Sequence, residues 1–319
     1  MEDSGGSNDF SHSNVENELS TSGWPLKTSR HRNHMDPSRA TRPPAAEKEY
    51  VLGTHDEEIE RLGLQHRVWR PRTLDAWRRA GFTAGNVIMD VGCGPGYASL
   101  DLAEIVGPKG RVVAVDRSRR FLDALEAASA ARRPTNITMH ELDLDEEDLP
   151  PVEADGAWLR WVLAFVKHPR DLLGQVAGRL KLGGVLVAHE YFNYSTWQLA
   201  PECPELDEFV KAVMESWRAD GGEPDIGLNV PAWLSELGFE IRTLNPIIDI
   251  VPRSSYVWEW PKAFVETGLR RLVVLGRMKA DRADEISAAF AAREAAAGTL
   301  MITPAVLETI AVRQRLTGT

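Results

Sequence analysis

The chain has 319 residues, 43% of them hydrophobic, enough to bury the core of one large domain with insertions or of one and a half ordinary domains. Its formal net charge of −10 opposes a nucleic-acid partner, because affinity for a phosphate backbone comes from clustered lysine and arginine. Its only two cysteines, Cys93 and Cys203, lie far apart without metal-ligand spacing, so the sequence predicts neither a disulfide framework nor a metal site.

The beginning of the chain is polar and acidic and lacks the basic flank and apolar stretch of a signal peptide. Residues 1–46 contain no apolar period, so we expect a disordered tail there. Nowhere do eighteen apolar residues follow one another, which predicts a cytoplasmic protein without a membrane span. The assembly is left open by the sequence, and a homodimer is one candidate.

Residues 47–82 form a leader in which an apolar stripe predicts one helix and Pro71 the start of a second. Strand and helix patterns then alternate through a core at 83–191. The expected strands cover 86–91, 111–116, 136–142, 155–160 and 184–191, and the helices between them cover 97–106, 118–133 and 169–180. Nearly continuous apolar strands separated by amphipathic helices indicate a doubly wound α/β fold with a parallel sheet.

The rhythm changes after Tyr191. An aromatic, acidic insertion at 192–230 is expected to form a wall of the substrate site. The segment 231–319 is expected to complete the sheet with a helix at 230–239, a strand at 240–251, a strand at 299–304 and a closing helix. It also carries a helical insertion at about 256–297, and such long insertions are typical of lids over strand ends.

The stretch VIMDVGCGPGYASLDL, residues 87–102, joins a buried strand to a glycine loop. A dinucleotide fingerprint requires the spacing G-x-G-x-x-G, but Tyr97 occupies the position of the third glycine. A phosphate-binding P-loop requires a Gly-Lys-Ser/Thr that does not follow here. The remaining pattern is D-x-G-x-G-x-G at the end of a first strand.

At this point the chain resembles the class I S-adenosylmethionine-dependent methyltransferases. The resemblance rests on the ordered series VIMDVGCGPG, VVAVD, NITMHELD and RLKLGGVLV, and it covers roughly residues 50–191. The leader YVLGTHDEEIERLGLQHRVW further resembles the small-molecule, UbiE-like branch. The resemblance implies a seven-stranded, mostly parallel sheet, helical insertions that form a substrate lid, and S-adenosyl-L-methionine as cofactor.

The same resemblance implies roles for individual residues. Gly92, Gly94 and Gly96 would let the backbone approach the ligand, which a side chain would otherwise prevent. Asp90 would lie near the methionyl ammonium, and Asp116 would accept both ribose hydroxyls. The other implied contacts are Arg117 and Leu144 beside the adenine, Asp143 at its amine, Arg160 at the methionyl moiety, and Tyr50 and Gln65 closing over the ligand.

These residues also have structural interpretations. Asp116 alone would more often be a turn residue, and Asp143 stands in the acidic run ELDLDEED, which is typical of a solvated face. Tyr50 and Gln65 fit packing equally well. The candidate catalytic residues are His189 and Glu190 at the end of the fifth strand, where a base could activate an acceptor; the alternative is that either is a satisfied buried polar group.

Aromatic residues follow that strand and populate the C-terminal half, at Tyr191, Phe192, Tyr194, Trp197, Trp217, Trp233, Trp258 and Trp260. Such density is usually core, yet it also suits a flat or apolar substrate. We therefore expect methyl transfer by in-line displacement to a small organic acceptor, phenolic, quinone-like or a specialised metabolite. The alternatives are an NAD-dependent oxidoreductase and a module that binds S-adenosylmethionine without methyl transfer.

Overall fold

The computed structural model describes residues 56–132 and 136–315. The expected tail at 1–46, the first part of the leader and Tyr50 therefore lie outside the described residues.

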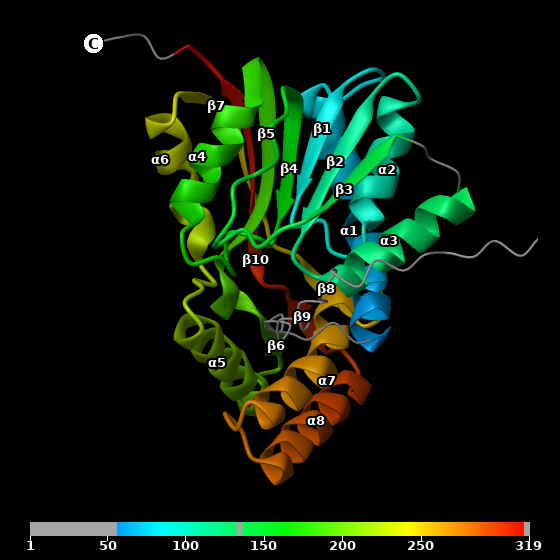
Figure 1. Cartoon of the computed structure of the whole chain (residues 1–319). Coiled ribbons are helices and arrows are strands. Elements are labelled where there is room, and N and C mark those ends of the chain that lie inside the picture. The colour runs from blue at the N-terminus through cyan, green and yellow to red at the C-terminus, as the bar shows by residue number, and fades with distance from the viewer. Residues whose placement is uncertain (1–55, 133–135, 316–319) are drawn as a thin grey trace, which may run out of the picture. The chain divides into compact units, whose positions relative to one another are not determined.

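A seven-stranded sheet forms the centre of the described chain, in the order β3-β2-β1-β4-β5-β10-β7 (Figure 1). The first five strands run parallel, and β10 lies antiparallel between β5 and β7. The bounds are β1 Val87–Val91, β2 Arg111–Asp116, β3 Ile137–Glu141, β4 Ala154–Arg160, β5 Leu180–Asn193, β7 Phe239–Ile247 and β10 Ala305–Arg313. The mostly parallel, doubly wound sheet expected from the sequence is confirmed.

Helices cover both faces of this sheet. One face carries α1 (Asp56–Ala80), α2 (Tyr97–Val106) and α3 (Arg119–Arg132), and the other carries α4 (Pro169–Arg179) and α6 (Val230–Glu236) (Figure 1). Burial on both faces explains why β1 and β2 are nearly continuous runs of valine and other apolar residues. The chain leaves β1 toward β2 on one side, whereas β4 lies on its other side. Ligands of such sheets bind at the carboxyl ends of the strands beside this switch point.

A second layer lies next to the carboxyl ends of the parallel strands. It contains α5 (Pro204–Ala219), α7 (Glu259–Val274) and α8 (Ala280–Ala295), together with a small antiparallel sheet of β6 (Gln198–Ala200), β9 (Leu300–Ile302) and β8 (Ile250–Pro252) (Figure 1). Three short 3₁₀ turns, η1 (Tyr194–Thr196), η2 (Ile226–Leu228) and η3 (Tyr256–Trp258), connect these elements. Its core is an aromatic cluster that includes Trp197, Phe209 and Phe264.

The leader differs from the expectation of two helices, because α1 continues through Pro71 as one helix of 25 residues. A proline inside a helix removes one backbone hydrogen bond and favours a break. Here Trp69 and Trp77, two turns apart on one face, are 0% and 1% exposed. Burial of these two side chains on either side of Pro71 stabilises the continuous helix more than the lost hydrogen bond destabilises it.

The expected closing helix is also wrong, because the segment AVLETIAVR forms β10. Its alanine, leucine and glutamate residues favour a helix locally, but seven consecutive residues from Ala305 are buried. A strand paired on both sides satisfies every backbone group of such a segment, whereas a helix there would expose apolar side chains. The expected strand at 240–251 is likewise divided between β7 and β8, which belong to different sheets.

Within residues 56–132 and 136–315, no helix has both the length and the apolar character needed to cross a membrane.

Candidate functional site

The loop between β1 and α2 has the backbone geometry that only glycine adopts easily. Gly92, Gly94 and Gly96 have φ angles of +69°, +54° and +79°. A Cβ at Gly92 would lie 2.5 Å from the Val162 side chain, and one at Gly96 would lie 2.3 Å from that of Leu125. A Cβ at Gly94 would meet nothing within 4 Å. The loop therefore packs tightly at its two ends, and its middle leaves room for a ligand to approach the backbone.

Asp116, at the end of β2, holds this loop. Its Oδ2 accepts a hydrogen bond from the Gly94 backbone N–H at 2.8 Å, and its Oδ1 accepts one from the Ser118 N–H at 2.9 Å. Burial raises the pKa of Asp116, and the two backbone donors oppose that rise. Each carboxylate oxygen can accept a further hydrogen bond, so the side chain is both part of the turn and available to a ligand.

Asp90, at the end of β1, is 2% exposed and accepts a hydrogen bond from Ser99 Oγ at 2.5 Å. Burial raises the pKa of Asp90 to about 6. The Ser99 hydroxyl and the nearby Arg160 cation both favour the charged form. The carboxylate therefore lies in a region of low polarity where a positively charged ligand group would be a favourable partner.

Arg160, at the end of β4, keeps its positive charge although burial lowers the pKa of its guanidinium to about 10. Its Nη1 lies 3.3 Å from Thr73 Oγ1 and its Nη2 lies 3.5 Å from His66 Nδ1. Because arginine can only donate, Nδ1 of His66 is the accepting nitrogen, and its Nε2 donates to Asp101 at 3.1 Å. Helix α1 thus orients Arg160 through a buried histidine that the sequence interpretation did not single out.

All but one of the cofactor-binding candidates within the described residues line one cavity. The exception is Gly96, where a Cβ would meet the Leu125 side chain. Those that line it are Gln65, Asp90, Gly92, Gly94, Asp116, Arg117, Asp143, Leu144 and Arg160. Asp143 also accepts a hydrogen bond from the Asp145 N–H at 3.0 Å, and Gln65 accepts one from Arg61. The structure therefore brings together residues that are up to 95 positions apart in the sequence, from Gln65 to Arg160.

The other walls of this cavity are aromatic. They include Trp161, Tyr191, Tyr194, Trp197, Trp217, Trp260 and Phe264, whereas Phe192, Trp233 and Trp258 do not line it. The cavity opens to solvent, and its lining joins polar residues at the strand ends to aromatic residues of the insertions.

His189 and Glu190 do not line the cavity. His189 is 0% exposed and lies between Trp69 and Trp158, and its Nε2 lies 3.1 Å from Glu308, directly opposite it on β10. Burial lowers the pKa of His189. The catalytic assignment of His189 and Glu190 stays a prediction. The contacts of His189 are those of a buried polar residue that has its hydrogen-bond partner within the protein.

Glu190 points to the opposite face of β5. Its Oε1 accepts hydrogen bonds from the Val162 and Leu163 backbone N–H groups at 2.8 and 2.9 Å. Burial raises the pKa of Glu190 to about 7, and these donors lower it again in part. Glu190 thus fixes the segment after β4, which carries Val162 against the glycine loop and Trp161 into the cavity wall.

Residues 88–184 match the family model of a methyltransferase domain. The chain carries a class I S-adenosylmethionine-dependent methyltransferase domain. Among its relatives, the ubiquinone/menaquinone biosynthesis C-methyltransferase UbiE of Ectopseudomonas mendocina is 29% identical over 133 residues, covering 40% of this chain and 50% of that protein. The chain spans about half or less of the first curated relatives that it matches.

Solved structures share the fold of the methyltransferase domain. A candidate methyltransferase from Bacillus halodurans has a TM-score of 0.51 and 13% identity, covering 76% of this chain and 98% of that one. Phosphoethanolamine N-methyltransferase 2 of Haemonchus contortus, solved with S-adenosyl-L-methionine, has a TM-score of 0.50 and 15% identity, and the match covers 79% of this chain and 56% of that one. At these identities the likeness concerns the fold alone.

The residues present fit S-adenosylmethionine, which is the methyl donor of this family. The open backbone at Gly94 lies beside the Asp116 carboxylate, which has accepting capacity for hydroxyl groups. The buried Asp90 carboxylate suits an ammonium group, and the Arg160 cation suits a carboxylate. These groups match the charged and hydroxylated parts of the cofactor, and the described lining of the cavity contains no lysine that could bind a phosphate.

Sequence reasoning missed several lining residues. Arg61 lines the cavity from α1, and its buried guanidinium is paired with Glu58 at 2.7 Å. Trp161 has a positive φ of 53°, the only such non-glycine residue in the described chain. Its place directly after the fourth strand was the available signal, because residues at that end of a parallel strand face the ligand. Nothing in the local pattern of the leader distinguished Arg61 from its neighbouring arginines.

Proposed function

We propose that the protein transfers the methyl group of S-adenosylmethionine to a small, flat organic acceptor, such as a phenolic, quinone-like or other specialised metabolite. The observation that carries the proposal is the composition of a single cavity. Its walls combine the glycine loop and the acids Asp90 and Asp116 with a set of tryptophan and tyrosine rings. A charged cofactor and an apolar acceptor can therefore share one site.

Bound S-adenosylmethionine supplies a methyl group that is already activated by its sulfonium. The chain then has to align the acceptor atom with that methyl group and exclude water. The aromatic walls perform the second task because they replace water around the acceptor. The first task falls to the same rings and to the segment 161–163, whose backbone is held by Glu190. The name of the UbiE relative assigns that protein to ubiquinone/menaquinone biosynthesis, which agrees with a flat acceptor.

Two measurements test the proposal. Calorimetry with S-adenosylmethionine, S-adenosylhomocysteine and NAD should show binding of the first two and none of NAD. Incubation with methyl-labelled cofactor and a small-molecule extract should then yield a labelled product that is absent with the Asp116→Ala variant. NAD binding without S-adenosylhomocysteine binding would favour the oxidoreductase alternative, and cofactor binding without any labelled product would favour a module that does not transfer methyl groups.

A further inference from the structure

We propose that the Tyr194 hydroxyl is the polar anchor for the acceptor, and that the acceptor is an uncharged, flat ring system with a hydroxyl or carbonyl oxygen. The inference rests on the proposed function, because it names the acceptor class for the same cavity. It is carried by the hydrogen-bonding state of Tyr194, by the contacts that fix its position and by the charges of the surrounding wall.

The Tyr194 hydroxyl has an unused hydrogen-bonding capacity in a buried position. The residue is 2% exposed and lines the cavity. Its ring packs edge-on against the rings of Tyr191 and Trp217, with centroid distances of 4.8 and 5.0 Å. Among the residues that the structure describes, its backbone N–H has a partner but its hydroxyl has none. The side chain as a whole is buried, and its hydroxyl lies in a cavity wall where no described protein group uses it, so it is available to a ligand in the cavity.

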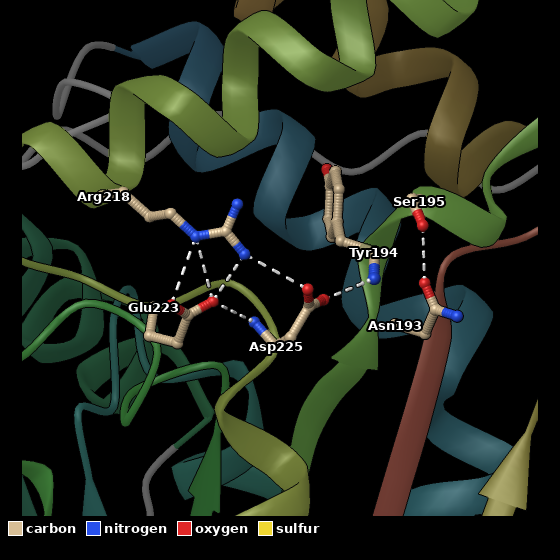
Figure 2. Close-up of polar contacts among 6 residues, drawn as sticks. All are labelled: Asn193, Tyr194, Ser195, Arg218, Glu223 and Asp225. Carbon is tan, nitrogen blue, oxygen red and sulfur yellow. Dashed lines mark hydrogen bonds and ion pairs between the residues drawn. The ribbon is translucent and has the colours of Figure 1, made fainter.

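The backbone of Tyr194 is held in place by a polar network outside the cavity. Its N–H donates to Asp225 Oδ1 at 2.7 Å, and Asp225 is in turn bound by Arg218 at 3.3 Å. Arg218 also pairs with Glu223 at 2.8 Å, so the end of α5 and the segment 223–225 are both tied to this turn. Figure 2 shows the Tyr194 ring extending away from these contacts. An anchor fixed before binding loses little entropy when the acceptor arrives.

The charges near Tyr194 favour an acceptor without a negative group. Arg61 is the cation that acts on the Tyr194 hydroxyl, and it is paired with Glu58 through hydrogen bonds of 2.8 and 2.7 Å while it also donates to Gln65 at 3.0 Å. Both side chains of this pair are at least nine-tenths buried, so the pair adds no net charge to the wall. Burial also raises the pKa of Tyr194, which keeps the hydroxyl neutral. The Arg160 cation of the same cavity is assigned to the carboxylate of the cofactor, so an acceptor carboxylate would lose its hydration without gaining an opposite charge of its own.

The ring orientations in the same wall favour a flat acceptor. Trp161 is stacked on Tyr191 with centroids 5.2 Å apart and on Trp260 with centroids 5.6 Å apart, and the interplanar angles are 10° and 11°. Three nearly parallel rings present one orientation on which a further planar ring can stack. The positive φ of Trp161 is a strained conformation of the kind that persists at ligand-binding positions.

Three naphthalene probes test the proposal by calorimetry or tryptophan fluorescence in the presence of S-adenosylhomocysteine. We expect 2-naphthol to bind at least as tightly as the more hydrophobic naphthalene, and 2-naphthoate to bind most weakly. Tyr194→Phe should weaken 2-naphthol binding by about threefold to tenfold, the contribution of one neutral hydrogen bond, and leave naphthalene binding unchanged. The control Tyr256→Phe makes the same change at a tyrosine that is 52% exposed, and it should alter neither affinity.

Two results would overturn the inference. An affinity for 2-naphthoate equal to or above that for 2-naphthol would exclude an uncharged acceptor class. Unchanged 2-naphthol binding in Tyr194→Phe would exclude the anchor. Tyr194→Phe loses no protein hydrogen bond, so the variant should have the melting temperature of the wild type. The ratio of the 2-naphthol and naphthalene affinities can also be measured in the wild type, without any variant. Absent S-adenosylhomocysteine binding would count against the proposed function instead, because the probe contrast can still be measured without it.

Discussion

Replacing Asp116 by alanine should weaken the binding of S-adenosylhomocysteine by about two to four orders of magnitude. Both carboxylate oxygens already accept a backbone hydrogen bond, from Gly94 and Ser118, and each can accept one more. A hydrogen bond to a charged group contributes about 1.5–3 kcal/mol, so losing two ribose contacts costs about 3–6 kcal/mol. At about 1.4 kcal/mol per tenfold change, this corresponds to roughly 10²–10⁴ in the dissociation constant.

Calorimetry measures this loss, and two comparisons separate the ligand contact from damage to the loop. Asp116→Asn keeps one accepting oxygen and should show an intermediate loss of about tenfold to a hundredfold. Asp123→Ala removes an exposed carboxylate from α3 and should leave the affinity unchanged. The 2′-deoxy analogue of S-adenosylhomocysteine should bind the wild type more weakly than the parent compound, whereas Asp116→Ala should no longer distinguish the two ligands. A folded Asp116→Ala protein with wild-type affinity would refute the ribose assignment.

Three further predictions concern the buried acids and the glycine loop. Burial raises the pKa of Asp90 to about 6, so the affinity for S-adenosylhomocysteine should fall as the pH drops below 6 and this carboxylate becomes neutral. Calorimetry between pH 5 and 8 measures this, and Asp90→Asn should bind weakly with an affinity that does not change with pH. Burial raises the pKa of Glu190 from its ordinary value of 4.5 to about 7, so the folded state binds the proton of this carboxyl more tightly than the unfolded state does. As the pH rises from 4.5 to 7, Glu190 therefore lowers the free energy of unfolding, by up to about 3 kcal/mol. Glu190→Gln keeps an acceptor oxygen for Val162 and Leu163, so its gain in melting temperature should be larger at pH 8 than at pH 5, and an equal gain would contradict the raised pKa. Gly96→Ala forces a Cβ to within 2.3 Å of a Leu125 methyl group and should destabilise the fold by about 1–3 kcal/mol in denaturant titrations, more than Gly94→Ala, which meets no neighbour.

The parallel part of the sheet could be predicted because its information is local. Each strand from β1 to β5 is a short, buried apolar run that ends near a helix signal, so the alternation of periods locates it. The candidate cofactor-binding residues could be brought together for a related reason. Asp116 and Arg160 end parallel strands and Asp90 is the last residue but one of β1, and the topology brings all such ends to one edge of the sheet.

The elements that were not predicted depend on contacts between distant segments. The segment 305–313 favours a helix by composition and becomes β10 only because β5 and β7 leave a gap between them with partners on both sides. Likewise, α1 continues through Pro71 because Trp69 and Trp77 are both buried, one in the aromatic cluster with Trp161 and Trp260 and the other in the cluster with Trp158. Neither the gap nor this shared burial can be seen in a window of ten or fifteen residues.

His189 and Tyr194 also differ in whether contacts with distant segments use their polar groups. His189 has the chemistry of a base and sits on a strand that leads to the site, but its role depends on which groups face it from other elements. Those groups are Glu308 on β10 and, behind it, Arg79 on α1, which pairs with Glu308 at 2.6 Å. Tyr194 lies just beyond the strand, where the chain has left the sheet and no ladder or neighbouring acid uses its hydroxyl. We therefore infer that the carboxyl ends of the strands supply the groups that suit the cofactor and that the insertions after them supply those that select the acceptor. Variants at Tyr194 should therefore change acceptor preference with little effect on cofactor affinity, and variants at Asp116 should do the reverse.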